Sequence, residues 1–437
     1  MTSLLYNANV AGAPEGTPAY MFIDGDKICA TGFGTPPPGM VADERTDCGG
    51  DLLIPGAIDC HVHTRDPGLT HKGDIATETA AARAGGVTSI LDMPNTVPPT
   101  TTMALVRAKM ERAAEAATAN YAFFIGAAGA SNMDEIKHAD YSAVPGIKLF
   151  MGSSTGNMLV DKDDDLRRIF DLAASLDTVI VVHAEDEGVI AARRAEVQAR
   201  YGAAEAPIRL HRYIRPSEAC IRATERAIAL AQRYSTRLHI AHVTTAAEAA
   251  MLSDAPLSPD KRVTAEVSPH HLLWCTEEDG DNPRMKMNPA VKTAADREAL
   301  RHAVADGRID IIATDHAPHL LGEKDGGALR AASGAPMVQF AVPAMLGLFD
   351  PQTVVRLMCH NPAILYAIQG RGSIAPGMYA DITRVRRVDP YTVHDADVVS
   401  RCAWTPMDGH RLRYRVIDTW LNGSRHGKPM PLSFARR

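Results

Sequence analysis

The chain has 437 residues, which is enough for a barrel of about 300 residues together with a smaller second domain. Its formal net charge is -6 and it has no basic run, so nucleic acid is not expected as a partner. The seven cysteines occur singly, and no apolar run approaches the roughly 18 residues of a membrane span. We therefore expect neither a disulfide-rich secreted protein nor a membrane protein, and we predict a cytoplasmic location.

Short apolar runs alternate with helix-like segments along most of the chain. Eight such runs, rich in β-branched residues, cover residues 52–60, 87–93, 121–128, 146–151, 178–184, 237–243, 262–268 and 310–315. Segments such as 74–85, 104–119 and 217–235 lie between them and space their apolar residues as amphipathic helices do. This alternation is typical of parallel strands joined by helices, and eight units predict a (β/α)8 TIM barrel.

The two ends of the chain have the pattern of strands and turns. Residues 21–32 form a hairpin-like unit with Asp-Gly at its turn, and the tail from residue 371 shows no helical periodicity. We therefore predict an α/β protein with a small β-sandwich domain built from both chain ends. Its boundaries would be residues 1–52 and 371–437, around a barrel of residues 53–370.

Polar side chains stand at the same end of six predicted strands. They are His61, His63, Arg65, Asn95, Lys148, His183, His242 and Asp315. Because active sites of TIM barrels lie at the C-terminal ends of the strands, we expect these side chains to converge. A single strand histidine is more often a core residue, but His61 and His63 share a strand face that suits one metal ion. Four histidines at one pole, together with Asp315, predict a metal site.

Lys148 is unusual at this pole because an ammonium group beside divalent cations would be repelled. The alternative interpretation is that Lys148 has no role in the site and extends its ammonium group to the barrel rim. A neutral lysine that has reacted with CO2 becomes a carbamate, whose two oxygens can bridge two metal ions. Zinc suits imidazole and oxygen ligands, although manganese, cobalt and iron occupy similar sites. We therefore predict two divalent metal ions, with zinc as the expected metal, and a carbamate on Lys148.

These motifs resemble the amidohydrolase superfamily and, within it, the long, metal-dependent dihydroorotase family. The resemblance covers essentially the whole chain, in residues 56–68, 72–100, 146–151, 181–186, 240–245, 268–272, 287–293, 313–319 and 372–382. The His-Val-His and Asp-His-Ala-Pro-His motifs are typical of the superfamily. The combination of Arg65 with Asn95 in Met-Pro-Asn is more typical of the dihydroorotase family. The substrate assignment rests on this combination.

The resemblance implies a role for each candidate residue. His61, His63 and Asp315 would bind the first metal ion, His183 and His242 the second, with carboxylated Lys148 bridging them; Arg65, Asn95, Asn288 and His319 would bind substrate. Asp315 would also be the catalytic acid and base. The implied reaction is the reversible cyclisation of N-carbamoyl-L-aspartate to L-dihydroorotate, with loss of water, in pyrimidine (UMP) biosynthesis. A guanidinium and amides suit this small anionic substrate.

Two alternative functions remain open. A hydantoinase, dihydropyrimidinase or allantoinase shares the metal ligands but usually lacks an arginine at position 65 together with Met-Pro-Asn. A non-catalytic assembly subunit would have lost metal ligands, and none is missing from this sequence. Family resemblance also implies a homodimer and allows an association with aspartate transcarbamoylase.

Several nearby features receive simpler interpretations. Cys60 is expected in the core, and His270 with His271 is expected to support the site rather than to bind metal. Residues 152–158 are rich in Gly and Ser and could form a lid over the substrate. Lys292 and Arg297 are the candidates for one further basic contact to the substrate.

Overall fold

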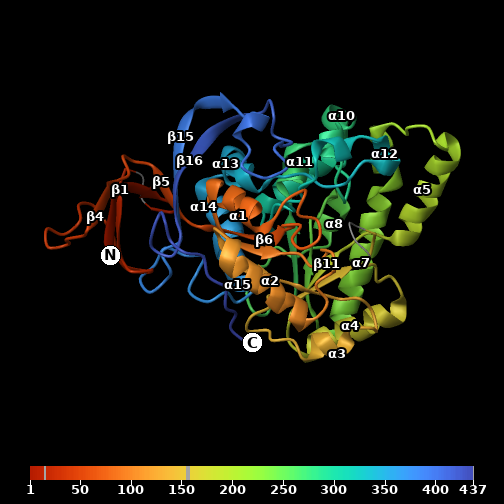
Figure 1. Cartoon of the computed structure of the whole chain (residues 1–437), viewed down its shortest axis with the longest axis horizontal. Helices are drawn as coiled ribbons and strands as arrows, with labels where there is room; N and C mark the ends of the chain where they lie inside the picture. Colours follow the sequence, from red (N-terminus) through yellow and green to blue (C-terminus); the bar gives the residue numbers. More distant parts are fainter. Residues whose placement is uncertain (14–15, 154–157, 437) are drawn as a thin grey trace.

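The computed structural model describes residues 1–13, 16–153 and 158–436. Figure 1 shows a sheet region at one side of the molecule and a larger helix-covered region beside it. The strands of the first region are β1 Thr2–Val10, β2 Ala19–Asp24, β3 Lys27–Phe33, β4 Glu44–Asp47, β5 Leu52–Pro55, β15 Ile382–Thr392 and β16 Arg411–Trp420. The strands of the second are β6 Ala57–Val62, β7 Val87–Asp92, β8 Asn120–Phe123, β9 Ile125–Gly126, β10 Ile147–Phe150, β11 Val179–His183, β12 Arg237–Ile240, β13 Val263–Val267 and β14 Ile311–Ile312.

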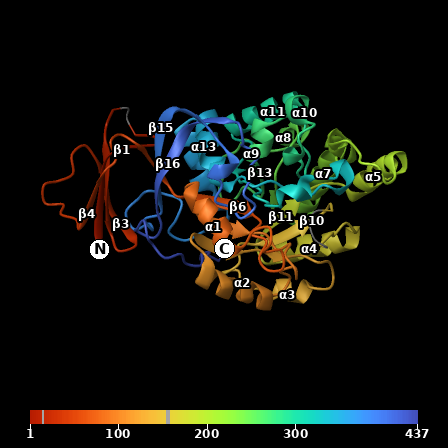
Figure 2. The same cartoon turned by 45° about the horizontal axis from the view of Figure 1, so that its top comes forward.

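The helices surround the second group of strands (Figure 2). They are α1 Ile75–Ala84, α2 Met103–Ala116, α3 Met133–Lys137, α4 Asp163–Ser175, α5 Glu187–Tyr201, α6 His211–Ile214, α7 Ser217–Tyr234, α8 Ala246–Ala250, α9 Pro269–Leu273, α10 Thr276–Asp279, α11 Ala294–Ala305, α12 Gly327–Arg330, α13 Val338–Leu348, α14 Pro351–Val355 and α15 Asn361–Leu365. The three quoted helical segments are confirmed as α1, α2 and α7. Within the described ranges, none of the helices has the length and apolar character needed to cross a bilayer.

The parallel strands follow each other in chain order, as the alternation predicts. One sheet has the order β6-β7-β8 and the other β14-β13-β12-β11-β10-β9. Only Phe124 separates β8 from β9, and a parallel bridge joins Val62 of β6 to His316, just beyond β14. The predicted strand 310–315 is shortened to Ile311–Ile312, and beyond it the Asp59 carboxylate accepts from Thr314 N at 3.0 Å. This arrangement is of the TIM-barrel type.

The first predicted strand is in fact two strands, divided at Gly56. Leu52–Pro55 (β5) pairs antiparallel with β15, whereas Ala57–Val62 (β6) pairs with β7. A Cβ at Gly56 would lie 2.2 Å from Thr88 Oγ1, so only glycine allows this close approach. A single apolar run in the sequence therefore serves two sheets.

The two chain ends meet in one mixed sheet, with strand order β16-β15-β5-β1-β2-β3 and β4 paired to β1. In both Figures 1 and 2 the N-terminal strands in red lie beside the C-terminal strands β15 and β16 in blue. The predicted hairpin is confirmed, because β2 and β3 pair antiparallel from Ala19↔Phe33 to Asp24↔Lys27.

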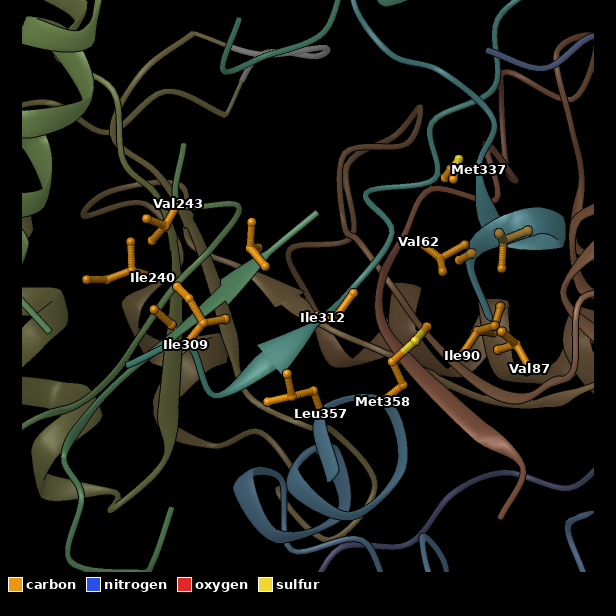
Figure 3. Close-up of a cluster of buried hydrophobic side chains, with 14 of the residues drawn as sticks. Val62, Val87, Ile90, Ile240, Val243, Ile309, Ile312, Met337, Leu357 and Met358 are labelled. Carbon is orange, nitrogen blue, oxygen red and sulfur yellow. The ribbon is translucent and has the colours of Figure 1, made fainter. Parts of the chain in front are cut away.

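The largest buried apolar cluster lies between the parallel strands and the helices that cover them. Figure 3 shows Ile312 of β14 near Leu357 and Met358, with Val62 of β6 on the other side of this part of the core. These four side chains are at most 2% exposed. Cys60 is completely buried, as expected.

A buried ion pair joins α2 to the end of β7. The Lys109 ammonium contacts the Asp92 carboxylate, whose other oxygen accepts from Thr64 N at 2.7 Å. We expect Lys109→Met to destabilise the fold by about 3 to 5 kcal/mol, because it leaves Asp92 as an uncompensated buried charge. Thermal unfolding would measure this loss. The exposed Arg167, which pairs with Asp163 and Asp164, provides the control: Arg167→Met should change stability by less than about 1 kcal/mol.

Candidate active site

Most of the predicted site residues lie around one cavity at the C-terminal ends of the parallel strands. Its lining includes His61, His63, Arg65, Asn95, His183, His242, Asn288 and Asp315, together with Phe150, Ala317, Ser333 and Gly334. The two remaining candidates adjoin this group. His319 contacts Arg65, and Lys148 lies in β10 beside Phe150, with its ammonium 5.1 Å from the centre of that ring.

His61 and His63 face Asp315 with the same ring nitrogen. His61 Nε2 lies 3.4 Å and His63 Nε2 3.2 Å from Asp315 Oδ1. The opposite nitrogens are already used: His61 Nδ1 contacts the Glu266 carboxylate, and His63 Nδ1 donates to Asn95 Oδ1 at 2.7 Å. With their Nδ1 atoms held by these partners, both rings turn Nε2 toward the Asp315 carboxylate. This arrangement suits a cation between them.

His183 and His242 form a second pair next to the first. His183 Nδ1 lies 2.9 Å from His242 Nε2, and the rings of His61 and His242 are 5.3 Å apart between centroids. Ligand atoms of His61, His242 and Asp315 all lie within 4.8 Å of one another, which makes them a candidate metal-binding group. The four histidines and Asp315 therefore line one small cavity.

Lys148 is fully buried, and its Nζ has no hydrogen-bond partner among the described residues. Burial lowers the pKa of Lys148 to about 8, against the opposing effect of Glu266 and Asp315. An unpaired buried amine is costly unless a further group completes its environment. The neutral form, which such a pKa makes accessible, is the form that reacts with CO2. The residues present thus fit a metal centre that includes a carboxylated lysine.

Two buried carboxylates support the histidines from outside the cavity, and the sequence analysis assigned neither of them a role. Glu266 of β13 contacts His61 and lies 3.1 Å from His239 Nε2. Glu185 accepts from His183 Nε2 at 2.9 Å and also contacts the Arg215 guanidinium. Such contacts fix the tautomer and orientation of a metal-binding imidazole. The spacing His183-Ala-Glu185 was the one available signal in the sequence.

Arg65 lines the cavity and contacts the His319 ring beside it. Arg65 has φ 67° and is 2% exposed; its Nε donates to Pro318 O at 3.0 Å, and an NH2 group lies 3.0 Å from His319 Nε2. Lys72 Nζ lies 3.1 Å from His319 Nδ1. Burial lowers the pKa of Arg65 to about 10, which still leaves its guanidinium charged at neutral pH. An anionic ligand therefore has a fixed positive partner here.

Neither candidate for an additional basic contact lines the cavity. Lys292 Nζ donates to the carbonyls of Arg215 and Ala290, and Arg297 pairs with Glu278 instead. Both cations instead hold neighbouring chain segments, and a further basic contact to the substrate stays a prediction. The expected lid over 152–158 falls mainly on residues 154–157, which lie outside the described residues.

His270 and His271 lie close to the site without lining its cavity. His271 hydrogen bonds with Ser268 Oγ at 2.9 Å and with Pro289 O at 3.1 Å. The ring of His270 stacks on Trp274 with a centroid separation of 5.6 Å. These contacts suit the supporting role expected for both residues.

The chain belongs to the amidohydrolase family, which matches residues 52–415. It is 34% identical over 400 residues to a dihydroorotase of Halobacterium salinarum, covering 89% of this chain and 88% of that protein. An allantoinase of Streptomyces avermitilis is 33% identical over 423 residues, covering 94% and 92%. The solved L-hydantoinase (dihydropyrimidinase) from Arthrobacter aurescens has a TM-score of 0.89 and 26% identity, covering 97% and 95%. The chain is therefore an amide hydrolase with a TIM-barrel type fold and a mixed-sheet region.

Proposed function

We propose that this chain is a dihydroorotase that interconverts N-carbamoyl-L-aspartate and L-dihydroorotate in de novo pyrimidine biosynthesis. One observation carries the proposal: the buried Arg65 guanidinium and the histidine and aspartate cluster line the same cavity. Dihydroorotate is a cyclic amide that carries a carboxylate. Its carboxylate would bind the Arg65 guanidinium, and its amide would face the histidine and aspartate cluster. The similarity to proteins named dihydroorotase supports the same substrate.

We also propose that the cavity holds two divalent metal ions and that zinc is the metal bound. His61, His63 and Asp315 would hold one ion and His183 with His242 the other, with a carbamate on Lys148 bridging them. Support comes from the paired Nε2 atoms facing Asp315 and from the partnerless Lys148 amine within the described residues. Bound ions of this kind would activate a water as nucleophile and polarise the ring carbonyl.

The protein residues would divide the remaining work. Arg65 and His319 would hold the substrate carboxylate, while the amides of Asn95 and Asn288 would orient the ring by hydrogen bonds. In ring opening, the Asp315 carboxylate would accept the proton of the nucleophilic water and pass it to the departing ring nitrogen. Ring closure is the reverse, so Asp315 would serve as base in one direction and acid in the other.

To test this proposal, the purified enzyme is loaded with zinc and incubated separately with N-carbamoyl-L-aspartate and with L-dihydroorotate. The enzyme should form L-dihydroorotate from N-carbamoyl-L-aspartate and the reverse, reaching the same final ratio from both sides. Chelation should remove both activities, and added metal should restore them. A zinc-loaded enzyme that converts neither compound would contradict the proposal.

Arg65 provides a sharper test of the substrate. Arg65→Lys keeps the positive charge but loses the planar fork, so kcat/KM for dihydroorotate should fall by about 2 to 4 kcal/mol of transition-state binding. Metal content, measured by elemental analysis, should stay at the wild-type level. Loss of metal in this variant would instead make Arg65 a structural support of the metal centre.

A second candidate function is hydrolysis of a related cyclic amide by a hydantoinase, dihydropyrimidinase or allantoinase activity. It is favoured by the Streptomyces allantoinase and by the Arthrobacter hydantoinase structure. Its neutral substrates would leave the Arg65 guanidinium without a carboxylate partner. A non-catalytic assembly subunit is disfavoured because all six predicted metal-binding side chains are present.

Further proposals concern the architecture and setting of the enzyme. We infer that the two parallel sheets make one closed (β/α)8 barrel within residues 53–370, whose first strand begins at Ala57. We also infer that residues 1–52 and 371–437, together with β5, form a β-sandwich. Seven free thiols suit a reducing compartment, which we propose is the cytoplasm. A homodimer, with or without aspartate transcarbamoylase, is our proposal for its assembly.

A further inference from the structure

A segment between β15 and β16 leaves the mixed sheet and reaches the candidate active site. We call residues 399–405 the clasp. Trp404 lies within it, is completely buried, and donates from Nε1 to His319 O at 2.7 Å. The clasp thus contacts the backbone of a predicted substrate-binding residue that is 85 positions away in the sequence.

The other end of the clasp holds the segment that follows β6. Arg401 donates from NH1 to Thr70 O at 2.5 Å and also pairs with Asp74. Ser400 Oγ donates to the buried Glu78 carboxylate of α1 at 2.6 Å, and Arg401 N donates to the same carboxylate at 3.2 Å. The clasp therefore joins the two chain segments that carry Arg65 and His319.

Trp404 and Arg65 bind consecutive carbonyls of one short segment. Arg65 Nε donates to Pro318 O at 3.0 Å, and Trp404 Nε1 donates to His319 O at 2.7 Å. Removing the indole N–H would leave a buried carbonyl without that donor, which favours a shifted backbone at His319. The His319 ring would then move relative to the Arg65 guanidinium. Within the described residues, Trp404 forms no hydrogen bond with the predicted metal-binding side chains.

We propose that Trp404 is a positioning residue for the Arg65 and His319 pair, and that the clasp sets affinity for the carboxylate end of the substrate. This inference rests on the proposed function for the identity of that substrate. The clasp comes from the region that carries the mixed sheet, so that region contributes to substrate recognition as well as to the fold.

The test compares Trp404→Phe with Trp420→Phe in the zinc-loaded full-length enzyme. Trp420 is a matched control, because it is 1% exposed and lies in β16, where its ring contacts Arg425. Trp404→Phe should raise KM for L-dihydroorotate about tenfold, with kcat and metal content near wild type, while Trp420→Phe leaves KM unchanged. Unchanged KM in a folded Trp404→Phe enzyme, or an equal rise in both variants, would overturn the inference.

Hydrogen exchange separates this inference from the proposed function. Exchange at residues 317–320 should become faster in Trp404→Phe but not in Trp420→Phe, whichever substrate the enzyme uses. A wild-type enzyme inactive on dihydroorotate would defeat the proposed function, whereas unchanged exchange at 317–320 would defeat the clasp. If Trp404→Phe does not fold, Arg401→Ala replaces it: its side chain is 40% exposed, and it should raise KM and speed exchange at residues 65–72. Failure to do either would overturn the inference.

Discussion

Lys148→Ala is expected to lower turnover about a thousandfold or more, because activation of water and substrate by bound metal is worth several kcal/mol. The buried amine has no hydrogen-bond partner among the described residues, which is consistent with a role that needs an added group. Short carboxylic acids such as acetate or propionate should restore part of the activity by supplying the missing carboxylate. Steady-state rates with and without each acid, together with metal content, measure this effect.

Lys162→Ala is the matched control, because Lys162 is exposed before α4 and should tolerate replacement without loss of activity. In native mass spectrometry, the metal-loaded wild type should exceed the sequence mass by one CO2 in addition to its bound metal, and Lys148→Ala should lack the CO2 increment. A Lys148→Ala enzyme with nearly normal activity and a full complement of metal would show that the carbamate proposal is wrong.

Asp315→Asn is expected to depress ring opening and ring closure together, by about a hundredfold or more, because it removes the shared proton carrier. Burial alone would raise the pKa of Asp315, but nearby His61 and the hydrogen bond with His63 outweigh it and hold the pKa below its ordinary value. The carboxylate is thus ionised at neutral pH. Initial rates in both directions measure the effect, and a variant that loses only ring opening would contradict the assignment.

The two directions should also respond oppositely to pH. Ring opening of dihydroorotate creates a second carboxylate and releases a proton, so its equilibrium shifts about tenfold toward N-carbamoyl-L-aspartate for each pH unit. Ring opening should rise with pH while the nucleophilic water loses its proton, and ring closure should fall over the same range. Rates measured from about pH 6 to 9 should therefore cross. Parallel profiles would contradict a single acid and base group.

The sequence predicted the strand order and the convergence of polar residues because both follow from local patterns. Eight alternating units define the parallel strands, and residues that end such strands meet at one pole. The division of the first strand at Gly56 was not predictable, since it depends on the distant partners β15 and β7. For the same reason, the contact from Trp404 to His319 leaves no local signal in the sequence.

In the site as well, residues with a local sequence signal were found, whereas contacts between distant residues were not. Lys148 was singled out because its charge is out of place in a strand that ends at a metal site. The supporting Glu266 was missed because its partner His61 is 205 positions away in the sequence, so no local spacing links the two residues. Lys292 was only one of two candidates, because a basic residue in a matching segment carries no information about the direction of its side chain. Its ammonium holds two backbone carbonyls instead.

The most direct test of the central claim is a comparison of kcat/KM for four ring substrates with one zinc-loaded preparation. L-dihydroorotate carries the carboxylate that Arg65 is proposed to bind, whereas hydantoin, dihydrouracil and allantoin do not. The account predicts that dihydroorotate is opened with a kcat/KM at least about a hundredfold above the other three, in line with the loss of a buried charged hydrogen-bond partner. A higher kcat/KM for hydantoin, dihydrouracil or allantoin than for dihydroorotate would contradict it.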